Sequence, residues 1–383
     1  MGQTVKHVLF ALIRSEINGS LINDDIKNLI TTETLPDLFK LSKRHDLAHL
    51  VCDALVKNGF LSNNTDIEKR FLYEYNMAIY RHEQIHFEFE QICSLFENCK
   101  IPFIPLKGSV IRGFYPETWM RTSCDIDILV SKDNLNLAIK ELENNLNYKF
   151  ESVGNHDAHL FSESGVHLEL HYSLGSAIQK GNLVDCWKNV KPTDKYQKEF
   201  IPEIFYLYHV AHMAGHFKLG GCGVRSVLDL WILKQKLNFE EEKLKKLLNE
   251  ENLLTFANET SDLSCVWFGD AKQTQWLEEL GNYILYAGMY GDMKNRVAIQ
   301  VDKKGSKFKY LMGRLFLPYK QLKYQYPLLQ KCCLLYPFYS IKRWFKLLGK
   351  ESRDKMLLEL KETTNGEQER KDSVNKIIKR LKL

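Results

Sequence analysis

The stretch that decides the fold is residues 101–130, with the sequence IPFIPLKGSVIRGFYPETWMRTSCDIDILV. It opens with an apolar run over residues 101–106, which predicts a short buried strand. Lys107, Gly108 and Ser109 follow and predict a tight turn into a helix, because glycine lets the backbone approach a ligand and serine caps helices. The free N–H groups of such a helix start favour an anion, and phosphate suits them best.

The same stretch ends with two closely spaced carboxylates. Asp125 and Asp127 lead into an apolar run that ends at Val130. Because side chains alternate along a strand, both aspartates face one side while Ile126 and Ile128 face a core. Two carboxylates on one face repel each other unless a cation lies between them, and their hard oxygens suit Mg²⁺. A phosphate-binding turn followed by such a strand is the layout of two-metal phosphoryl or nucleotidyl transfer.

A third carboxylate lies in a later predicted hairpin. Residues 158–172 form two alternating runs around a polar turn, which is typical of paired strands. In the second run His167, Glu169 and His171 alternate with leucines, so one face is polar and the other apolar. Glu169 lies in the middle of the polar face, where a carboxylate needs a partner. We expect it to join the two aspartates, although pairing with a nearby Lys or Arg is an alternative.

These motifs resemble a known signature. A Gly-Ser turn, an Asp-x-Asp strand and a later strand carboxylate, in this order, look like the DNA polymerase β-like nucleotidyltransferases. The longer segments around these motifs are similar to the uncharacterised nucleotidyltransferase family of that superfamily. These segments are Leu106-Lys-Gly-Ser109, Tyr115-Pro116, Arg121, Asp125-Ile-Asp-Ile-Leu-Val130 and His167-Leu-Glu-Leu-His171. The likeness is closest over residues 101–172 and continues more loosely through residues 209–233 and the C-terminal region.

The resemblance implies a chemistry and a set of site residues. It implies a Mg²⁺-dependent transferase, with Mn²⁺ as an alternative metal, that moves an NMP from an NTP to a hydroxyl or phosphate acceptor and releases pyrophosphate. Asp125, Asp127 and Glu169 would be the metal ligands and the catalytic residues.

The nucleotide is expected at the glycine-serine turn. Gly108 and Ser109 would hold the triphosphate, and Lys107 and Arg121 would be cations beside it. For the first two residues the alternative is an ordinary turn and cap. For the two cations the alternative is a surface charge.

Further polar residues are expected to line the cleft. Residues 208–216 predict a helix with His209, His212 and His216 on one face. Zinc is the weaker interpretation, because no glutamate follows His212 as it does in HExxH proteases. Residues 224–233 predict a further helix in which Arg225 and Asp229 form an ion pair. The candidate cleft-lining residues are His167, His171, His212 and His216.

The length and composition of the whole chain limit the possible architectures. With 383 residues, 44% hydrophobic and 26% charged, it can bury more than one core. Its nine cysteines contain no CxxC pair and no signal peptide is evident, which indicates a cytoplasmic protein. We expect an α+β fold in which a small mixed β-sheet nucleotidyltransferase core is flanked by N-terminal and C-terminal helical lobes. The expected units are an N-terminal helical lobe (1–98), the core (99–195), a helical lobe (196–300), a basic aromatic segment (301–350) and a charged helix or tail (351–383).

Positive charge is concentrated near the C-terminus. The net charge is +5, yet residues 303–350 contain twelve Lys or Arg and no Asp or Glu, which leaves the rest at −7. Interleaved aromatic residues suit a membrane surface, single-stranded nucleic acid or an acidic partner, and a solvated basic flank is the plain alternative. We favour a membrane surface or an anionic partner, although Pro318, Pro327 and Pro337 interrupt any single long helix.

The motifs are compatible with several classes of acceptor. A small metabolite, a sugar or antibiotic, a peptide, a protein side chain and an RNA end are all compatible with the motifs. No segment resembles a nucleic-acid-binding domain, which favours a small molecule or peptide. Two other interpretations are a catalytically idle scaffold with the same fold and a toxin-like transferase that modifies tRNA or protein. The intact carboxylate set favours an enzyme over the scaffold.

Overall fold

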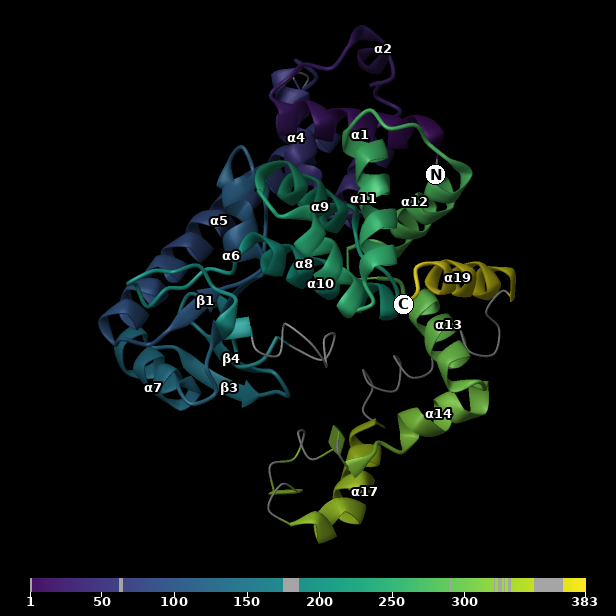
Figure 1. Ribbon diagram of the computed structural model, residues 1–383. Coiled ribbons are helices and arrows are strands. Elements are labelled where there is room, and N and C mark those ends of the chain that lie inside the picture. The colour runs from purple at the N-terminus through teal and green to yellow at the C-terminus, as the bar shows by residue number, and fades with distance from the viewer. Residues whose placement is uncertain are drawn as a thin grey trace.

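The computed structural model describes residues 2–61, 65–174, 186–289, 291–319, 321–322, 326, 328–329, 332–347 and 368–383. The protein is mostly helical and has one small mixed sheet, as the α+β prediction requires (Figure 1). Parts of all five predicted units lie outside the described residues. Most of these residues belong to the basic segment (320, 323–325, 327, 330–331 and 348–350), to the predicted charged tail (351–367) and to the end of the predicted core (175–185).

The sheet has five strands in the order β1-β2-β5-β4-β3. β2 pairs with β5 in parallel and the other neighbours are antiparallel, so the sheet is mixed. The predicted hairpin is present as β4 and β5, and the predicted first strand is present but shorter than expected. The strand bounds are β1 Phe103–Pro105, β2 Asp125–Val130, β3 Lys149–Val153, β4 Asp157–Phe161 and β5 His167–His171.

One face of the sheet is covered by two helices, α5 (Asp66–Asn98) and α7 (Leu135–Leu146). Ile126 and Ile128 of β2, and Leu168 of β5, are fully buried in the core beneath these helices. The alternation predicted for β2 and β5 therefore holds, because the apolar set faces α5 and α7. The polar set on the same strands faces away from this core, towards the helices that follow the sheet in the chain.

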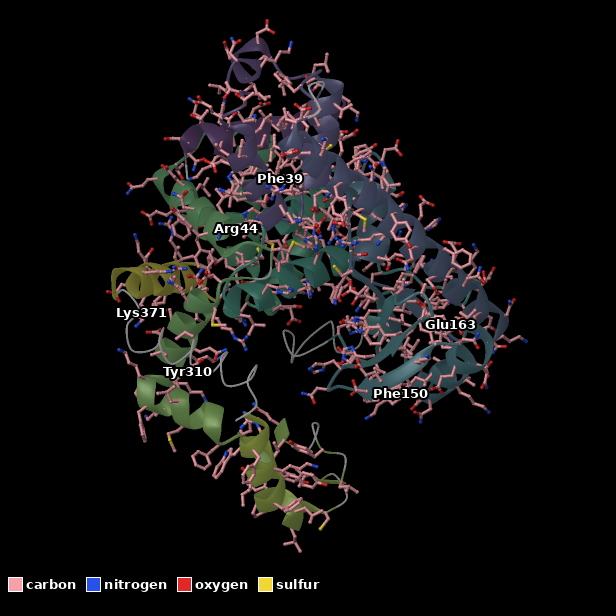
Figure 2. The ribbon with its side chains drawn as sticks, turned by 180° about the vertical axis from the view of Figure 1, so that it is seen from behind. Phe39, Arg44, Phe150, Glu163, Tyr310 and Lys371 are labelled. Carbon is pink, nitrogen blue, oxygen red and sulfur yellow. The ribbon has the colours of Figure 1, made fainter. Side chains whose placement is uncertain are left out.

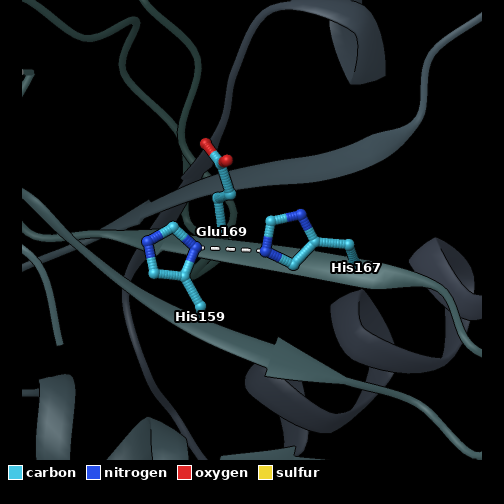
Figure 3. A group of neighbouring side chains, drawn as sticks. All are labelled: His159, His167 and Glu169. Carbon is cyan, nitrogen blue, oxygen red and sulfur yellow. Dashed lines mark hydrogen bonds between the residues drawn. The ribbon is translucent and has the colours of Figure 1, made fainter. Parts of the chain in front are cut away.

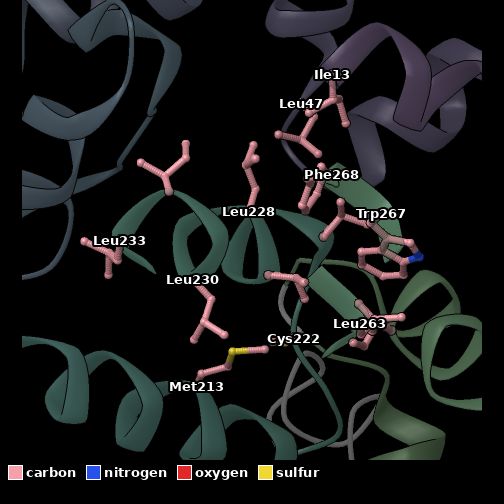
Figure 4. Packing of buried hydrophobic residues seen from close by; sticks show 14 of the residues in the cluster. Ile13, Leu47, Met213, Cys222, Leu228, Leu230, Leu233, Leu263, Trp267 and Phe268 are labelled. Atoms are coloured by element: carbon pink, nitrogen blue, oxygen red, sulfur yellow. The ribbon is translucent and has the colours of Figure 1, made fainter. Parts of the chain in front are cut away.

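Those helices and the N-terminal helices share one hydrophobic core. Figure 4 shows Ile13 and Leu47 of the N-terminal region beside Trp267 and Phe268 of α11. The Phe10 and Trp267 rings stack with centroids 4.5 Å apart. The two predicted helical lobes thus meet in a common interior. Their helices are α1 Gln3–Asn18, α2 Asp24–Lys27, α3 Leu35–Arg44, α4 Ala48–Lys57, α8 Pro202–Lys218, α9 Val224–Lys236, α10 Glu241–Glu250, α11 Leu254–Phe268 and α12 Gln275–Ala287.

The C-terminal part leaves this body and then returns to it. α13 (Met293–Lys304) and α14 (Lys307–Leu315) lead outward, and α17 (Tyr336–Leu347) lies at the far end (Figures 1 and 2). α19 (Gln368–Arg380) lies back against the body, with Val374 and Ile377 buried in the main core. α19 is the helix of the predicted charged helix or tail, and its apolar face is packed against the main core. No described helix is both long enough and apolar enough to span a bilayer.

The turn before β2 differs from its prediction. The expected helix is one turn, α6 (Gly108–Ile111), continued by two 3-10 turns, η1 (Arg112–Phe114) and η2 (Thr118–Met120). Ser109 does not cap it, because the helix starts at Gly108 and the Ser109 N–H donates to the Leu106 carbonyl at 3.1 Å. The physical reason is the positive φ of Lys107, 44°, which reverses the chain one residue earlier than expected.

Candidate active site

Parallel pairing of β2 with β5 brings the predicted carboxylates together. Asp127 lies opposite Glu169, and Asp125 lies opposite His167, on the sheet face away from α5 and α7. Residues paired in this way share a face of the sheet because the side-chain period is two. The two aspartates and Glu169 therefore come from separate parts of the sequence to one polar surface.

A lysine from the turn lies between two of these acids. The Lys107 Nζ is 2.6 Å from the Asp127 Oδ1 and 3.7 Å from the Glu169 Oε2. His171 reaches the same two carboxylates, with its Nε2 2.8 Å from Asp127 and 3.4 Å from Glu169. Asp127 is only 2% exposed. Its negative charge is thus neutralised inside the protein by two cationic groups.

The protonation states follow from this network. Burial opposes ionisation of Asp127, but the charges of Lys107 and His171 hold its pKa well below the usual value. Burial also disfavours the charged forms of the two partners. Even so, the neighbouring Asp127 raises the pKa of Lys107, and hydrogen bonds to Asp127 and Glu169 raise the pKa of His171 to about 9. At neutral pH the network therefore contains two cations and two carboxylates.

Asp125 stands apart from this network. The ligand atoms of Asp127, Glu169 and His171 lie within 4.8 Å of one another, and Asp125 does not belong to that group. Burial and the charge of Asp127 raise the pKa of Asp125 to about 6. Within the described part of the chain Asp125 forms no ion pair, although Lys107 and His167 partly offset the charge of Asp127, so its ionised form is a good partner for an added cation.

The donor set fits a hard divalent cation. Asp125, Asp127 and Glu169 supply carboxylate oxygens on one face, which is the ligand chemistry of Mg²⁺ and Mn²⁺. The Lys107 ammonium between Asp127 and Glu169 marks a point where these acids stabilise positive charge. The position of Lys107 and the raised pKa of Asp125 both indicate that the face favours additional cationic charge.

The turn that carries Lys107 is held from behind by an arginine that sequence reasoning did not single out. Arg112 donates from its Nε to the Gly108 carbonyl at 2.9 Å and from its Nη2 to the Ser123 hydroxyl at 2.5 Å. A Cβ at Gly108 would lie 3.1 Å from the Ser123 Cβ, so glycine also permits this packing. Lys107 has φ 44° and ψ −123°, a backbone conformation that costs about 1–3 kcal/mol for a non-glycine residue. Packing of the turn by Arg112 sustains that conformation.

Arg121 reaches the site but already has a carboxylate partner. Its Nε donates to the two Asp229 oxygens at 2.8 and 3.0 Å, and the Tyr115 hydroxyl donates to the same carboxylate at 2.7 Å. The predicted Arg225–Asp229 pair is wrong, because Arg225 instead donates to Asp46. Sequence spacing placed both residues on α9 correctly, but the partners come from other elements.

A cavity of about 370 Å³ lies over the carboxylates. Its volume falls within the range of roughly 300–1,000 Å³ usual for small-molecule sites. The sheet and turn form one wall, and α8 and α9 form the other. The lining residues with polar side chains include Lys107, Arg121, Asp125, Asp127, Glu169, Tyr208, His209, His212, His216, Arg225 and Asp229. Another cavity, of about 400 Å³, lies beside α1 and α12, where Glu278 is the acidic lining residue, so the carboxylate set distinguishes the first cavity.

The histidines of α8 face this cavity as uncharged groups. Burial and the charge of Lys107 lower the pKa of both His212 and His216. Their rings lie edge to face with centroids 4.6 Å apart. No group of three metal-ligating side chains was found around them within the described residues. They provide neutral hydrogen-bonding and ring surfaces opposite the carboxylates.

Three other predicted residues do not line this cavity. Ser109 lines a separate cavity with Phe114 and Phe205, and its buried hydroxyl has no hydrogen-bond partner among the residues that the structure describes. His171 lies beneath Asp127 and Glu169 as their hydrogen-bond partner. His167 pairs with His159 on β4. Of the predicted nucleotide-binding residues, the structure therefore brings Lys107, Gly108 and Arg121 to the cavity, while Ser109 points away from it.

The His159–His167 pair forms a second polar group beside Glu169 (Figure 3). The His159 Nδ1 and His167 Nε2 are 3.1 Å apart, and the Asp157 carboxylate lies 3.4 Å from the other nitrogen of His159. A hydrogen bond between the two ring nitrogens accounts for this geometry without an ion. His159 could have been noticed in the sequence only through its alternation with apolar neighbours, which is a weak signal.

A comparison with known families matches most of these elements. The family model described as uncharacterised nucleotidyltransferase matches residues 32–269. The match begins just before α3 and ends one residue after α11, so it includes the sheet, the Lys107 turn and both helices of the opposite cavity wall. No curated protein and no solved structure matches the chain.

Proposed function

The chain belongs to the uncharacterised nucleotidyltransferase family, and from that premise we propose that it transfers an NMP from an NTP to an acceptor and releases pyrophosphate. The acceptor group is a hydroxyl or a phosphate. The proposed metal is Mg²⁺, with Mn²⁺ as a substitute. The observation that carries this proposal is the register of β2 and β5, which sets Asp127 beside Glu169 and places Asp125 on the same face under a cavity.

The metal ligands would be Asp125, Asp127 and Glu169. When bound, the metal ions supply charge neutralisation at the triphosphate and lower the pKa of the acceptor hydroxyl. Lys107 lies next to these acids, and its cation would then be available to the phosphates instead of to Asp127 alone. His171 holds the Asp127 and Glu169 carboxylates from below and so acts as a positioning residue.

The reaction itself needs little covalent chemistry from the protein. The acceptor oxygen forms a bond to the α-phosphorus, the bond from that phosphorus to the pyrophosphate oxygen breaks, and the acceptor proton passes to a site carboxylate or to water. The protein's main contributions are orientation and a fixed set of charges. Gly108 and Lys107 bring the backbone of the turn to the cavity edge, where the triphosphate would bind.

The acceptor is proposed to be a small molecule or peptide. The wall opposite the carboxylates is formed by α8, which contributes His212, His216 and Tyr208 as uncharged lining groups, and by α9, which contributes Arg225 and Asp229. These side chains can contact a polar, uncharged acceptor by hydrogen bonding and ring packing. Such a wall at a cavity of this size supports a compact acceptor over a long polymer.

A thermal-shift experiment tests the proposal. The protein is melted with each NTP, with and without Mg²⁺, and the same series is repeated for Asp125→Ala/Asp127→Ala. We expect a rise in Tm that requires both nucleotide and metal and is lost in the double variant, because ligand binding to the folded state stabilises it. Glu151→Ala on β3 is the matched control, since Glu151 is an exposed acid of the same sheet.

Transfer is then measured with α-labelled NTPs and fractionated cell extract. Label in the small-molecule or peptide fraction, lost in the double variant, supports the proposal. Label in tRNA or protein instead supports a toxin-like transferase. A chain that shows no nucleotide response with either metal would be a scaffold, and the proposed reaction would then be rejected.

A further inference from the structure

α17, at the end of the C-terminal arm, presents an apolar face to solvent. Phe338 is 62% exposed, Ile341 49% and Phe345 70%. Their spacing of three and four residues puts them on one side of the helix. The preceding 3-10 turn, η4 (Cys333–Leu335), adds Leu334, which is 85% exposed. Together these four residues are called the α17 apolar face.

The other side of α17 is packed, so this exposure is not a sign of an unfolded element. Tyr339 is buried with Leu322 and Leu329 in a small separate core. The Tyr319 and Tyr336 rings also meet, with centroids 6.1 Å apart. The helix is thus held in place through one face, while the α17 apolar face stays in contact with water. An exposed apolar patch held in this way marks an interaction surface.

The segment of sequence that carries this patch has charge of one sign. Residues 303–350 contain twelve Lys or Arg and no acidic residue. Among the exposed cations are Lys342 on α17 and Lys307 and Lys309 on α14, where they flank the 70% exposed Phe308. A partner with complementary charge is therefore anionic, and it must also accept apolar side chains.

We propose that the C-terminal arm docks on an anionic membrane surface, with the α17 apolar face inserted at the boundary between headgroups and acyl chains. A helix that combines exposed Phe and Leu with nearby Lys and Arg binds a bilayer interface in this way. Leu334 and Ile341 favour lipid over single-stranded nucleic acid, because aliphatic side chains do not stack on bases as aromatic rings do. Basic residues add attraction to anionic lipids within a Debye length of the surface.

Vesicle co-sedimentation of the full chain tests this docking. Binding is measured to vesicles of phosphatidylcholine mixed with phosphatidylglycerol and to vesicles of phosphatidylcholine alone, in low and high salt. We expect binding to the anionic vesicles that weakens in high salt. Phe338→Asp/Phe345→Asp should bind at least about tenfold more weakly, because two apolar contacts with the bilayer are replaced by charges that the anionic surface repels.

The control changes two equally exposed aromatic residues outside the arm. Tyr80 and Phe87 on α5 are 61% and 64% exposed, and Tyr80→Asp/Phe87→Asp should bind as the unmodified protein does. Tm and nucleotide response report that each variant is folded. Failure to bind anionic vesicles, or equal loss in both double variants, overturns the proposal. Tight binding to a single-stranded oligonucleotide in place of vesicles, lost in Phe338→Asp/Phe345→Asp, would overturn it in favour of nucleic acid.

Discussion

His171 links the charge of the site to the stability of the fold. Its ring is buried beneath Asp127 and Glu169 and donates to carboxylates that would otherwise repel each other. A buried imidazolium is costly by itself, and only the two acids make it favourable. The same contact therefore positions the carboxylates for a metal and fixes the protonation of the network in the metal-free protein.

The stability of the metal-free protein should fall as the pH rises from about 6.5 to about 9. The pKa of His171 is raised from 6.5 to about 9 in the folded state, so the folded protein holds this proton more tightly than the unfolded chain does. The stabilisation is complete below pH 6.5 and is lost as His171 deprotonates near pH 9. Tm measured across this range in the presence of a chelator checks the prediction. His171→Gln should flatten the profile, and an unchanged slope in that variant would contradict it.

Lys107 competes with any metal for the same carboxylates. Lys107→Met should reduce the stability of the metal-free protein by about 3 kcal/mol, because Asp127 is left buried without its closest cation. Added Mg²⁺ should then stabilise the variant more than it stabilises the unmodified protein, since no ammonium lies between Asp127 and Glu169. Urea unfolding with and without Mg²⁺ measures both effects.

Lys149→Met serves as the control, because Lys149 is an exposed lysine of β3. It should change neither the stability of the metal-free protein nor the stabilisation by added Mg²⁺. If Mg²⁺ stabilised Lys107→Met no more than the unmodified protein, the metal would not share the position that Lys107 now holds.

At the scale of helices and strands, the hydrophobic periodicity of the sequence predicted the features that depend on local residues. The β4–β5 hairpin follows from two alternating runs around a polar turn. The carboxylates of β2 and β5 could be assigned to one polar face for the same reason. Because local patterns indicate which side of a strand is apolar, the candidate metal ligands could be predicted from the sequence.

Contacts between distant elements were not predictable in this way. Arg225 and Asp229 lie one turn apart on α9, yet each pairs with a residue more than a hundred positions away. Serine is a common helix cap, but the positive φ of Lys107 makes the helix begin at Gly108, one residue before Ser109. Both outcomes depend on how the turn, the sheet and α9 pack together, and no spacing rule contains that information.

The Arg121–Asp229 pair should make a large contribution to the docking of α9 against the core. Both side chains are more than nine-tenths buried, and Tyr115 adds a hydrogen bond to the same carboxylate. Asp229→Asn should cost about 3–5 kcal/mol, because it leaves the Arg121 charge buried without a carboxylate. Tyr115→Phe should cost about 1–2 kcal/mol, the price of one buried hydrogen bond. Equilibrium unfolding gives both values, and a Tyr115→Phe effect equal to that of Asp229→Asn would contradict this ranking.

At the scale of the whole molecule, the cavity belongs to two parts of the chain. Asp125 and Glu169 come from the sheet, whereas His212 and Arg225 come from helices that share a core with the N-terminal region. A ligand in the cavity would therefore contact both parts at once. The family match supports this view, because it covers α3–α5 and α8–α11 as well as the sheet. The helices around the sheet are thus part of the unit that the family model matches and not additions to it.

Nucleotide binding should therefore protect both walls of the cavity from hydrogen–deuterium exchange. With an NTP and Mg²⁺ we expect slower exchange in β2 and β5, and also in α8 and α9, because opening of either wall would expose the bound ligand. α14 should exchange as before, since it contributes no residue to the cavity lining. Asp125→Ala/Asp127→Ala should show no added protection in either wall. Protection confined to β2 and β5 would show that α8 and α9 do not hold the nucleotide. The histidines of α8 would then be available to bind the acceptor instead.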